Sequence, residues 1–201
     1  MQCRACVGRA LDEQAKALVQ ADGGGNHHDG GADKRIIGTN KGDNLSGGGD
    51  TIEGRKGDDV LLGAGGDDHL DGGRGDDTLQ GGAGAAILTG GPGADIFKYV
   101  ARSEAPAEQG DSEGHDHAAA SLETILDFQA GIDTLDFSGI GGLRGFARAP
   151  DAFSIWVEQD GSDALVKVAF DGGFAGVAEA EMVIVLQNVD AMGIGAEDFL
   201  L

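Results

Sequence analysis

Apolar side chains recur at a fixed spacing between residues 38 and 98. The segment divides into seven consecutive units, of which six have nine residues and the second has seven: 38–46, 47–53, 54–62, 63–71, 72–80, 81–89 and 90–98. Each unit has an apolar residue just before its last position: Leu45, Ile52, Leu61, Leu70, Leu79, Leu88 and Phe97. A unit this short cannot bury an apolar side chain alone, so the spacing predicts stacked units with this column facing inward.

Glycine and aspartate fill the polar part of each unit. The sixth position carries Asp43, Asp59, Asp68, Asp77 and Asp95, and the shortened unit carries Asp50. The first and fourth positions of units three, four, five and seven are Gly54, Gly57, Gly63, Gly66, Gly72, Gly75, Gly90 and Gly93. Glycine allows positive φ and lets carbonyl oxygens crowd toward one point, and hard oxygen ligands suit calcium. We therefore predict that these residues bind several calcium ions.

Successive units should fall on opposite sides of the stack, so that a metal ion lies between units two apart. On one side stand the aspartates of the odd units, which predict three consecutive sites: Asp43, Asp59, Asp77 and Asp95. The other side has Asp50 and Asp68, but unit six carries Ala86 in place of the aspartate. We expect this second row to be weak or partly empty.

The flanking segments lack the repeat. Residues 7–21 place apolar residues near helical spacing and predict a short N-terminal helix, and 22–34 predict a flexible linker with His27 and His28 in solvent. After an acidic loop at 103–120, alternating patterns predict strands at 124–128, 134–137, 152–158, 164–170 and 182–188. The turn Asp160-Gly161 predicts a hairpin between two of them.

These patterns predict an all-β fold: a parallel β-roll at 36–98, capped by a β-sandwich-like region or continued roll at 99–201 and preceded by a helix and linker at 1–35. A disordered Gly-Asp linker is the alternative, because 38 of the 201 residues are glycine. The unbroken apolar column argues against disorder in the metal-loaded state. Without metal, the backbone entropy and the repulsion between aspartates should leave the roll unfolded.

The formal net charge of −21 makes cations the natural partners and disfavours nucleic acid and anionic membranes. No apolar run is long enough to insert into a membrane, and we expect a monomer. Cys3 with Cys6, and His115 with His117, offer too few ligands for a transition-metal site. No motif of a zinc protease, serine hydrolase or nucleotide enzyme is present, so we expect no catalysis and no cofactor besides Ca²⁺.

The repeats resemble those of RTX calcium-binding proteins. The resemblance extends over residues 36–201, because GGPGADIFKY (90–99), ETILDFQAGIDTLDFSGI (123–140) and EDFLL (197–201) are similar to the C-terminal module of serralysin metalloproteases and the R-modules of alginate epimerases. It implies that Asp127 and Asp133 also bind calcium. Glu123 stands where that family usually has aspartate.

The same resemblance implies a secreted, extracellular protein. Residues 1–6 lack the apolar stretch of a cleavable secretory signal, so we expect export by a type I secretion apparatus that reads the closing residues 197–201. Calcium outside the cell would then fold the roll and stabilise the exported chain. The alternative is a carbohydrate-binding R-module acting on an exopolysaccharide such as alginate, although the roll has few basic residues for an anionic sugar: Lys41, Arg55, Lys56, Arg74 and Lys98.

Overall fold

The computed structural model describes residues 18–20, 26–28, 35–48, 51–100, 121–140, 143, 145–146, 154–169 and 182–201. One sheet contains, in spatial order, β1 (Leu18–Gln20), β3 (Arg35–Ile37), β5 (Thr51–Lys56), β7 (His69–Arg74), β9 (Ile87–Thr89), β11 (Ser121–Ile125), β16 (Met182–Leu186), β15 (Asp163–Ala169), β14 (Ser154–Asp160) and β13 (Gly145–Phe146). The other contains β17 (Phe199–Leu200), β12 (Thr134–Asp136), β10 (Ile96–Lys98), β8 (Thr78–Gln80), β6 (Val60–Leu62), β4 (Asn44–Ser46) and β2 (Asn26–His28).

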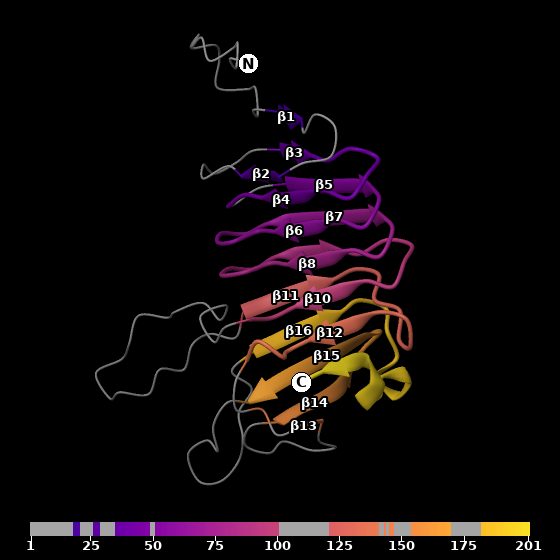
Figure 1. The fold of residues 1–201 in the computed structure, drawn as a ribbon. Helices are drawn as coiled ribbons and strands as arrows, with labels where there is room; N and C mark the ends of the chain where they lie inside the picture. The colour runs from indigo at the N-terminus through magenta and orange to yellow at the C-terminus, as the bar shows by residue number, and fades with distance from the viewer. Residues whose placement is uncertain are drawn as a thin grey trace, which may run out of the picture.

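Consecutive strands of the repeat region belong alternately to the two sheets. β4, β6, β8 and β10 pair in parallel in one sheet, and β5, β7 and β9 pair in parallel in the other. The chain thus winds as a coil whose strands stack from β1 at the top of Figure 1 to β13 and β14 at the bottom. This is the parallel β-roll that the repeat predicts.

The apolar column forms two ladders of matching side chains inside the roll. In one sheet the register aligns Ile36, Ile52, Leu70, Leu88 and Ile125. In the other it aligns Leu45, Leu61, Leu79, Phe97, Leu135 and Phe199. All seven predicted column residues are at most 1% exposed, which confirms that the next-to-last position of each unit is the core position.

The region after the repeats extends both sheets. β11 and β12 pair in parallel with β9 and β10, and β17 then pairs with β12. β14 and β15 form the predicted hairpin, whose turn contains Gly161 at φ +63°. Two 3-10 helices, η3 (Ala191–Gly193) and η4 (Ala196–Asp198), precede β17, whose Phe199 stacks against Phe137. The cap therefore shares its core with the roll.

The N-terminal prediction is wrong where the structure describes it. Leu18–Gln20 form β1 rather than the end of a helix, and Asn26–His28 form β2 within the predicted linker. The physical reason is the open edge of each sheet: β1 pairs with β3 and places Val19 opposite Ile36, and β2 pairs with β4. Such pairing overrides a weak helical pattern. The rest of the predicted helix, the two cysteines and the acidic loop at 103–120 lie outside the described residues.

No helix in the described part of the chain has the length and apolar character needed to cross a bilayer.

Candidate metal sites

Buried aspartates stack in a row along one side of the roll. The main-chain N–H of Asp43 donates to Oδ1 of Asp59 (2.6 Å), that of Asp59 to Asp77 (2.7 Å) and that of Asp77 to Asp95 (2.9 Å). Asp133 continues the row, because its Oδ1 accepts from the N–H of Asp95 at 3.1 Å. Each of these five side chains is at most 2% exposed. The predicted odd-unit row is thus one continuous ladder of carboxylates.

The second oxygen of three of these carboxylates is an orphan. Oδ2 of Asp59, Asp77 and Asp95 is buried and has no hydrogen-bond partner among the described residues. An unpaired buried carboxylate oxygen is costly, because it has lost its water without gaining another partner. A bound cation or a proton would therefore stabilise these buried oxygens.

The first glycine of each unit makes room for this oxygen. A Cβ added to Gly54 would lie within 3.0 Å of both Oδ2 of Asp59 and the carbonyl oxygen of Gly72. A Cβ on Gly72 or Gly90 would meet Oδ2 of the aspartate five residues later in the same way. Of the two roles predicted for the glycines, these first-position residues are needed for close approach and not for positive φ.

The fourth-position glycines show the conformation that the sequence predicts. Gly57, Gly66 and Gly75 have φ of +106°, +104° and +133°. Gly93 does not share this φ, but a Cβ there would collide with the carbonyl oxygen of Gly75. The two kinds of glycine together let neighbouring turns of the roll stack closely enough for carbonyl and carboxylate oxygens to converge.

Burial and mutual repulsion disturb the aspartates of the row. Loss of solvent, reinforced by the neighbouring carboxylates, raises the pKa of Asp59 and Asp77 to about 6 and that of Asp95 to about 7. Burial likewise raises the pKa of Asp133. In the absence of metal, Asp59, Asp77 and Asp95 therefore keep their protons to a higher pH than an ordinary aspartate.

Asp127 differs from the row in its surroundings. Its Oδ1 accepts from the N–H of Gly90 at 3.0 Å and its Oδ2 from the N–H of Gly91 at 2.8 Å. Both oxygens thus bind the main chain at the start of unit seven. The structure brings Asp133 into the row and places Asp127 on the same side of the roll, in the turn between β11 and β12 and beside the turn that contains Gly90 and Asp95.

The second row contains Asp68, Ala86 and Glu123, while Asp50 lies outside the described residues. Asp68 repeats the geometry of the first row, because a Cβ on Gly63 would lie within 3.0 Å of both its Oδ2 and the carbonyl oxygen of Gly81. Asp68 is 2% exposed and Glu123 is 3% exposed. Gly63, Gly66 and Asp68 therefore occupy the same relative places as their counterparts in the first row.

A further ladder was missed by the sequence reasoning. Fifth-position aspartates accept from the main chain two units later: Asp58 from Asp76, Asp67 from Ala85, and Asp76 from Ala94, at 2.9 to 3.0 Å. The signal was available as the recurring Gly-Asp-Asp of units three, four and five. These side chains are exposed and join neighbouring turns.

The geometry fits calcium better than a transition metal. Among the described residues, no three His, Cys, Asp or Glu side chains converge on one point. A bound cation would therefore take main-chain carbonyl oxygens together with one or two carboxylates. Such an all-oxygen ligand set is the one that calcium prefers.

Two sheets whose repeat strands pair in parallel around an apolar column, with buried carboxylates stacked along their turns, define the class of parallel β-rolls. Residues 45–79 and 71–98 match the family described as the RTX calcium-binding nonapeptide repeat, in four copies. The chain thus carries RTX calcium-binding repeats. No curated protein matches its sequence at a significant level.

Similar solved structures include two subunits of the Azotobacter vinelandii mannuronan C5-epimerase. AlgE6R3 is 23% identical, with 92% of this chain and 80% of that chain covered and a TM-score of 0.45. AlgE6R2 is 29% identical, with 84% and 92% covered and a TM-score of 0.46. The extracellular lipase LipA of Serratia marcescens is 16% identical, with 87% of this chain but 40% of that chain covered and a TM-score of 0.38.

Proposed function

We propose that this chain is a calcium-dependent folding module whose roll forms when calcium binds along the stacked aspartates. The observation that carries this proposal is the set of orphan Oδ2 atoms of Asp59, Asp77 and Asp95, each buried beside the first glycine of its unit. A divalent cation at these positions would offset the desolvation and the repulsion between neighbouring carboxylates. Calcium and folding would then be thermodynamically linked.

The first row would hold calcium between successive aspartates, from Asp43 to Asp133. The main-chain carbonyls of Gly54 and Gly72, which lie within 3.0 Å of a Cβ added at Gly38 and at Gly54, would supply neutral ligands beside the carboxylates. The bound ion supplies positive charge inside the turns. The chain itself supplies the rigid spacing, because each Oδ1 is fixed by the N–H of the preceding aspartate.

This coupling suits a protein that is exported unfolded and folds outside the cell. Where calcium is scarce, the close carboxylates would keep the roll open, and extracellular modules bind calcium at about 10⁻⁴ to 10⁻³ M. The closing residues 197–201 support a type I export signal by their acidic and apolar composition. In the folded chain Asp198 is buried and Phe199 pairs with Leu135, while Leu200 and Leu201 remain about half exposed, so folding would cover part of this segment.

Calcium titration followed by far-UV circular dichroism tests the proposal, with magnesium as the control ion. We expect little β-structure in excess chelator and a cooperative gain in calcium. A spectrum that is already complete in chelator, or an equal gain with magnesium, would contradict it.

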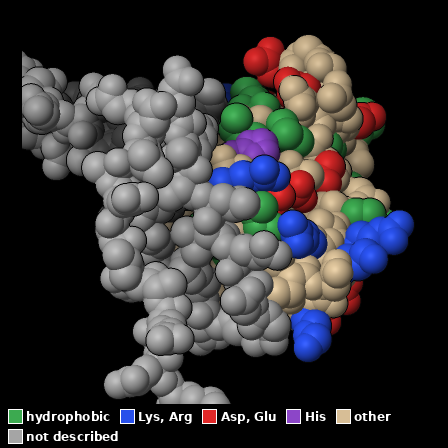
Figure 2. Space-filling view, turned by 90° about the horizontal axis from the view of Figure 1, so that it is seen from above, with side chains coloured by type: hydrophobic (Ala, Val, Ile, Leu, Met, Phe, Trp, Pro, Cys, Tyr) green, Lys and Arg blue, Asp and Glu red, His purple; other side chains and the backbone are tan. Residues whose placement is uncertain are grey.

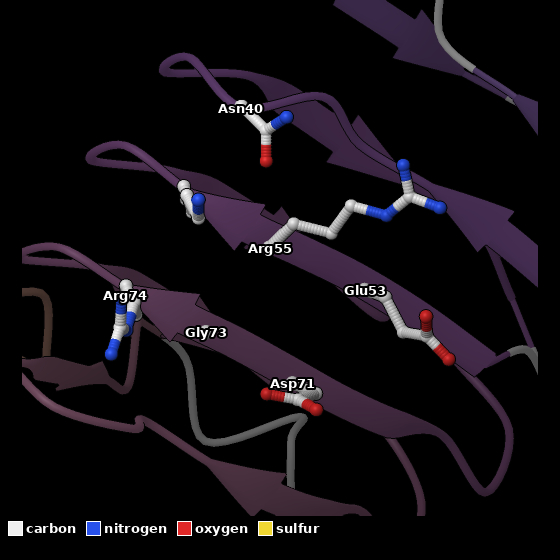
Figure 3. A pocket seen from close by; sticks show the side chains of 7 residues that line it. Asn40, Glu53, Arg55, Asp71, Gly73 and Arg74 are labelled. Atoms are coloured by element: carbon white, nitrogen blue, oxygen red, sulfur yellow. The ribbon is translucent and has the colours of Figure 1, made fainter.

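A second candidate function is binding of an anionic polysaccharide, with no catalytic step. A depression of about 410 Å³ on the β5–β7 face is lined by Arg55, Lys56 and Arg74, together with Asn40, Glu53, Asp71 and Gly73. Figure 3 shows Arg55 and Glu53 projecting from β5, with Asp71 and Arg74 from the adjacent β7. Seen from above in Figure 2, blue basic side chains lie among red carboxylates on the described part of the surface. Three cations against two carboxylates make this spot locally positive in an acidic chain.

The backbone of Arg55 follows the repeat. Arg55 has φ +84° at the second position of its unit, where Ala64 has +68° and Gly73, Gly82 and Gly91 have +92° to +102°. This candidate therefore rests on the three basic side chains that line the depression. Binding of alginate oligomers in millimolar calcium tests it: Arg55→Gln/Arg74→Gln should lose binding while the calcium midpoint of folding stays unchanged. Absence of binding by the wild-type protein across anionic polysaccharides would exclude this candidate and leave the folding module.

A further inference from the structure

Glu123 stands in the second row at the point where the repeat lacks its aspartate. β11 and β9 pair in parallel with Thr124 opposite Ile87, so Glu123 lies opposite Ala86. The N–H of Thr124 donates to the carbonyl of Ala86 at 3.0 Å, which fixes this register. With 3% of Glu123 exposed, its carboxylate is directed into the roll rather than toward solvent.

The first glycine of each unit locates the carboxylate oxygen. At Gly54, Gly63, Gly72 and Gly90, an added Cβ would lie within 3.0 Å of Oδ2 of the sixth-position aspartate of the same unit. At Gly81 the same unit offers only the Cβ of Ala86, at 2.8 Å. The nearest atom there is instead Oε1 of Glu123, also within 3.0 Å. Oε1 of Glu123 thus occupies the place that Oδ2 of aspartate occupies in the other units.

The length of the glutamate side chain explains this substitution. Neighbouring strands in a sheet lie about 4.8 Å apart, and Glu123 belongs to the strand after the one that carries Ala86. An alanine at position 86 leaves space beside its Cβ, and the additional methylene of glutamate carries the carboxylate into that space. Aspartate at position 123 is shorter by one methylene.

We propose that Glu123 replaces the carboxylate missing at Ala86 and completes a calcium site at Gly81 in the second row. The inference rests on the proposed calcium function and names a ligand for it. Asp68 lies on the adjacent turn, since its Oδ2 and the carbonyl of Gly81 both face the open side of Gly63. The second row therefore runs without interruption from Asp68 to Glu123, in place of the partly empty row that the sequence predicts.

Counting bound calcium by native mass spectrometry and isothermal titration calorimetry tests this inference. Glu123→Gln keeps the size of the side chain and removes its charge, so we expect one calcium ion fewer than in the wild type. Glu158→Gln is the matched control, because Glu158 lies on the exposed part of β14, away from the glycines of the roll. An unchanged ion count and affinity in Glu123→Gln would overturn the inference. A wild-type protein that binds no calcium would instead overturn the proposed function itself.

A second set of variants tests whether the length of the Glu123 side chain is needed to place its carboxylate at Gly81. Glu123→Asp keeps the charge but withdraws the carboxylate from Gly81, so it should also lose one ion. Ala86→Asp combined with Glu123→Asp should restore that ion, because unit six then carries its own sixth-position carboxylate. Wild-type calcium binding by Glu123→Asp alone, or no recovery in the double variant, would contradict the proposed replacement. A variant that failed to fold even in saturating calcium would be revealed by circular dichroism, and the double variant would then decide.

Discussion

The main-chain N–H of Asp59 donates to Oδ1 of Asp77 at 2.7 Å, although the two residues are 18 positions apart and both side chains are buried. The same bond recurs between Asp77 and Asp95, so one oxygen of each carboxylate holds the scaffold. The other oxygen, Oδ2, lies beside the first glycine of the same unit and has no hydrogen-bond partner among the described residues. In Asp77 and Asp95, Oδ1 therefore joins neighbouring turns of the roll, and Oδ2 is available to a cation.

Removing the charge of one such carboxylate separates these two roles. Asp77→Asn keeps an oxygen that can accept from Asp59, but it loses the charge that attracts calcium. A charged interaction is worth roughly 1.5 to 3 kcal/mol and each 1.4 kcal/mol is a factor of ten, so the calcium midpoint of folding should rise about tenfold or more. Asp76→Asn on the exposed ladder is the control and should shift the midpoint little. Equal midpoints for the two variants would contradict the assignment.

The raised pKa values predict that protons and calcium compete. The pKa of Asp59 and Asp77 rises from an ordinary value of 3.8 to about 6, and that of Asp95 to about 7, in the metal-free fold. Between about pH 4 and 7 the folded roll therefore binds more protons than the unfolded chain, so acid stabilises the metal-free roll and this stability is lost as pH rises through 6 to 7.

Calcium titrations at pH 5, 6 and 7.5 measure this competition. The calcium concentration needed to saturate the sites should rise as pH falls, because calcium must displace those protons. In chelator, β-structure should increase toward pH 5. Asp77→Asn should show a weaker pH dependence than the wild type. A saturation midpoint that is constant across this range would show that protons and calcium do not compete for these carboxylates.

The first-position glycines should not tolerate a methyl group. Gly54→Ala would place Cβ against Oδ2 of Asp59 and the carbonyl of Gly72, so we expect a loss of about 1 to 3 kcal/mol and weaker calcium binding. Gly65→Ala is the control, because the nearest atom to its Cβ would be the carbonyl oxygen of Ala83 at 3.7 Å. Urea unfolding in saturating calcium measures both. Similar losses for the two variants would show that close approach at Gly54 is not required for stability or calcium binding.

The positive φ of Ala64 predicts that its replacement by glycine stabilises the fold. Its φ is +68°, a region where alanine is strained and glycine is not. Ala64→Gly should therefore raise the free energy of unfolding by up to about 1 kcal/mol. Ala83→Gly, at an exposed position without positive φ, should instead lower it by roughly 0.5 to 1 kcal/mol. Thermal unfolding in calcium distinguishes the two, and stabilisation by both would point to a cause other than backbone strain.

The repeat made the centre of the fold predictable. The inward position of Leu61 and Leu79, the alternation of sides and the row of aspartates all follow from a period that repeats the same local contacts. The N-terminal strands were not predictable in this way, because β1 and β2 have no repeat and are held by the sheet edges that they cover. Pairing at a sheet edge depends on the tertiary fold, so the periodicity of the local sequence does not predict it.

The candidate site was predictable only to the level of the repeat unit. Spacing identified Asp59, Asp77 and Asp95, but it could not show that Asp133 joins them across 38 residues of sequence. It also treated Ala86 as a gap. The contact between Glu123 and Gly81 depends on the register of β11 with β9, which follows a segment without repeats.

Amide hydrogen exchange at Asp59, Asp77 and Asp95 shows whether the roll folds only with calcium, because these N–H groups form the ladder between the carboxylates. We expect exchange near the unfolded rate in excess chelator at pH 7.5 and strong protection in millimolar calcium, with no comparable protection in magnesium. Equal protection of these three amides in chelator and in calcium would show that the roll folds without calcium.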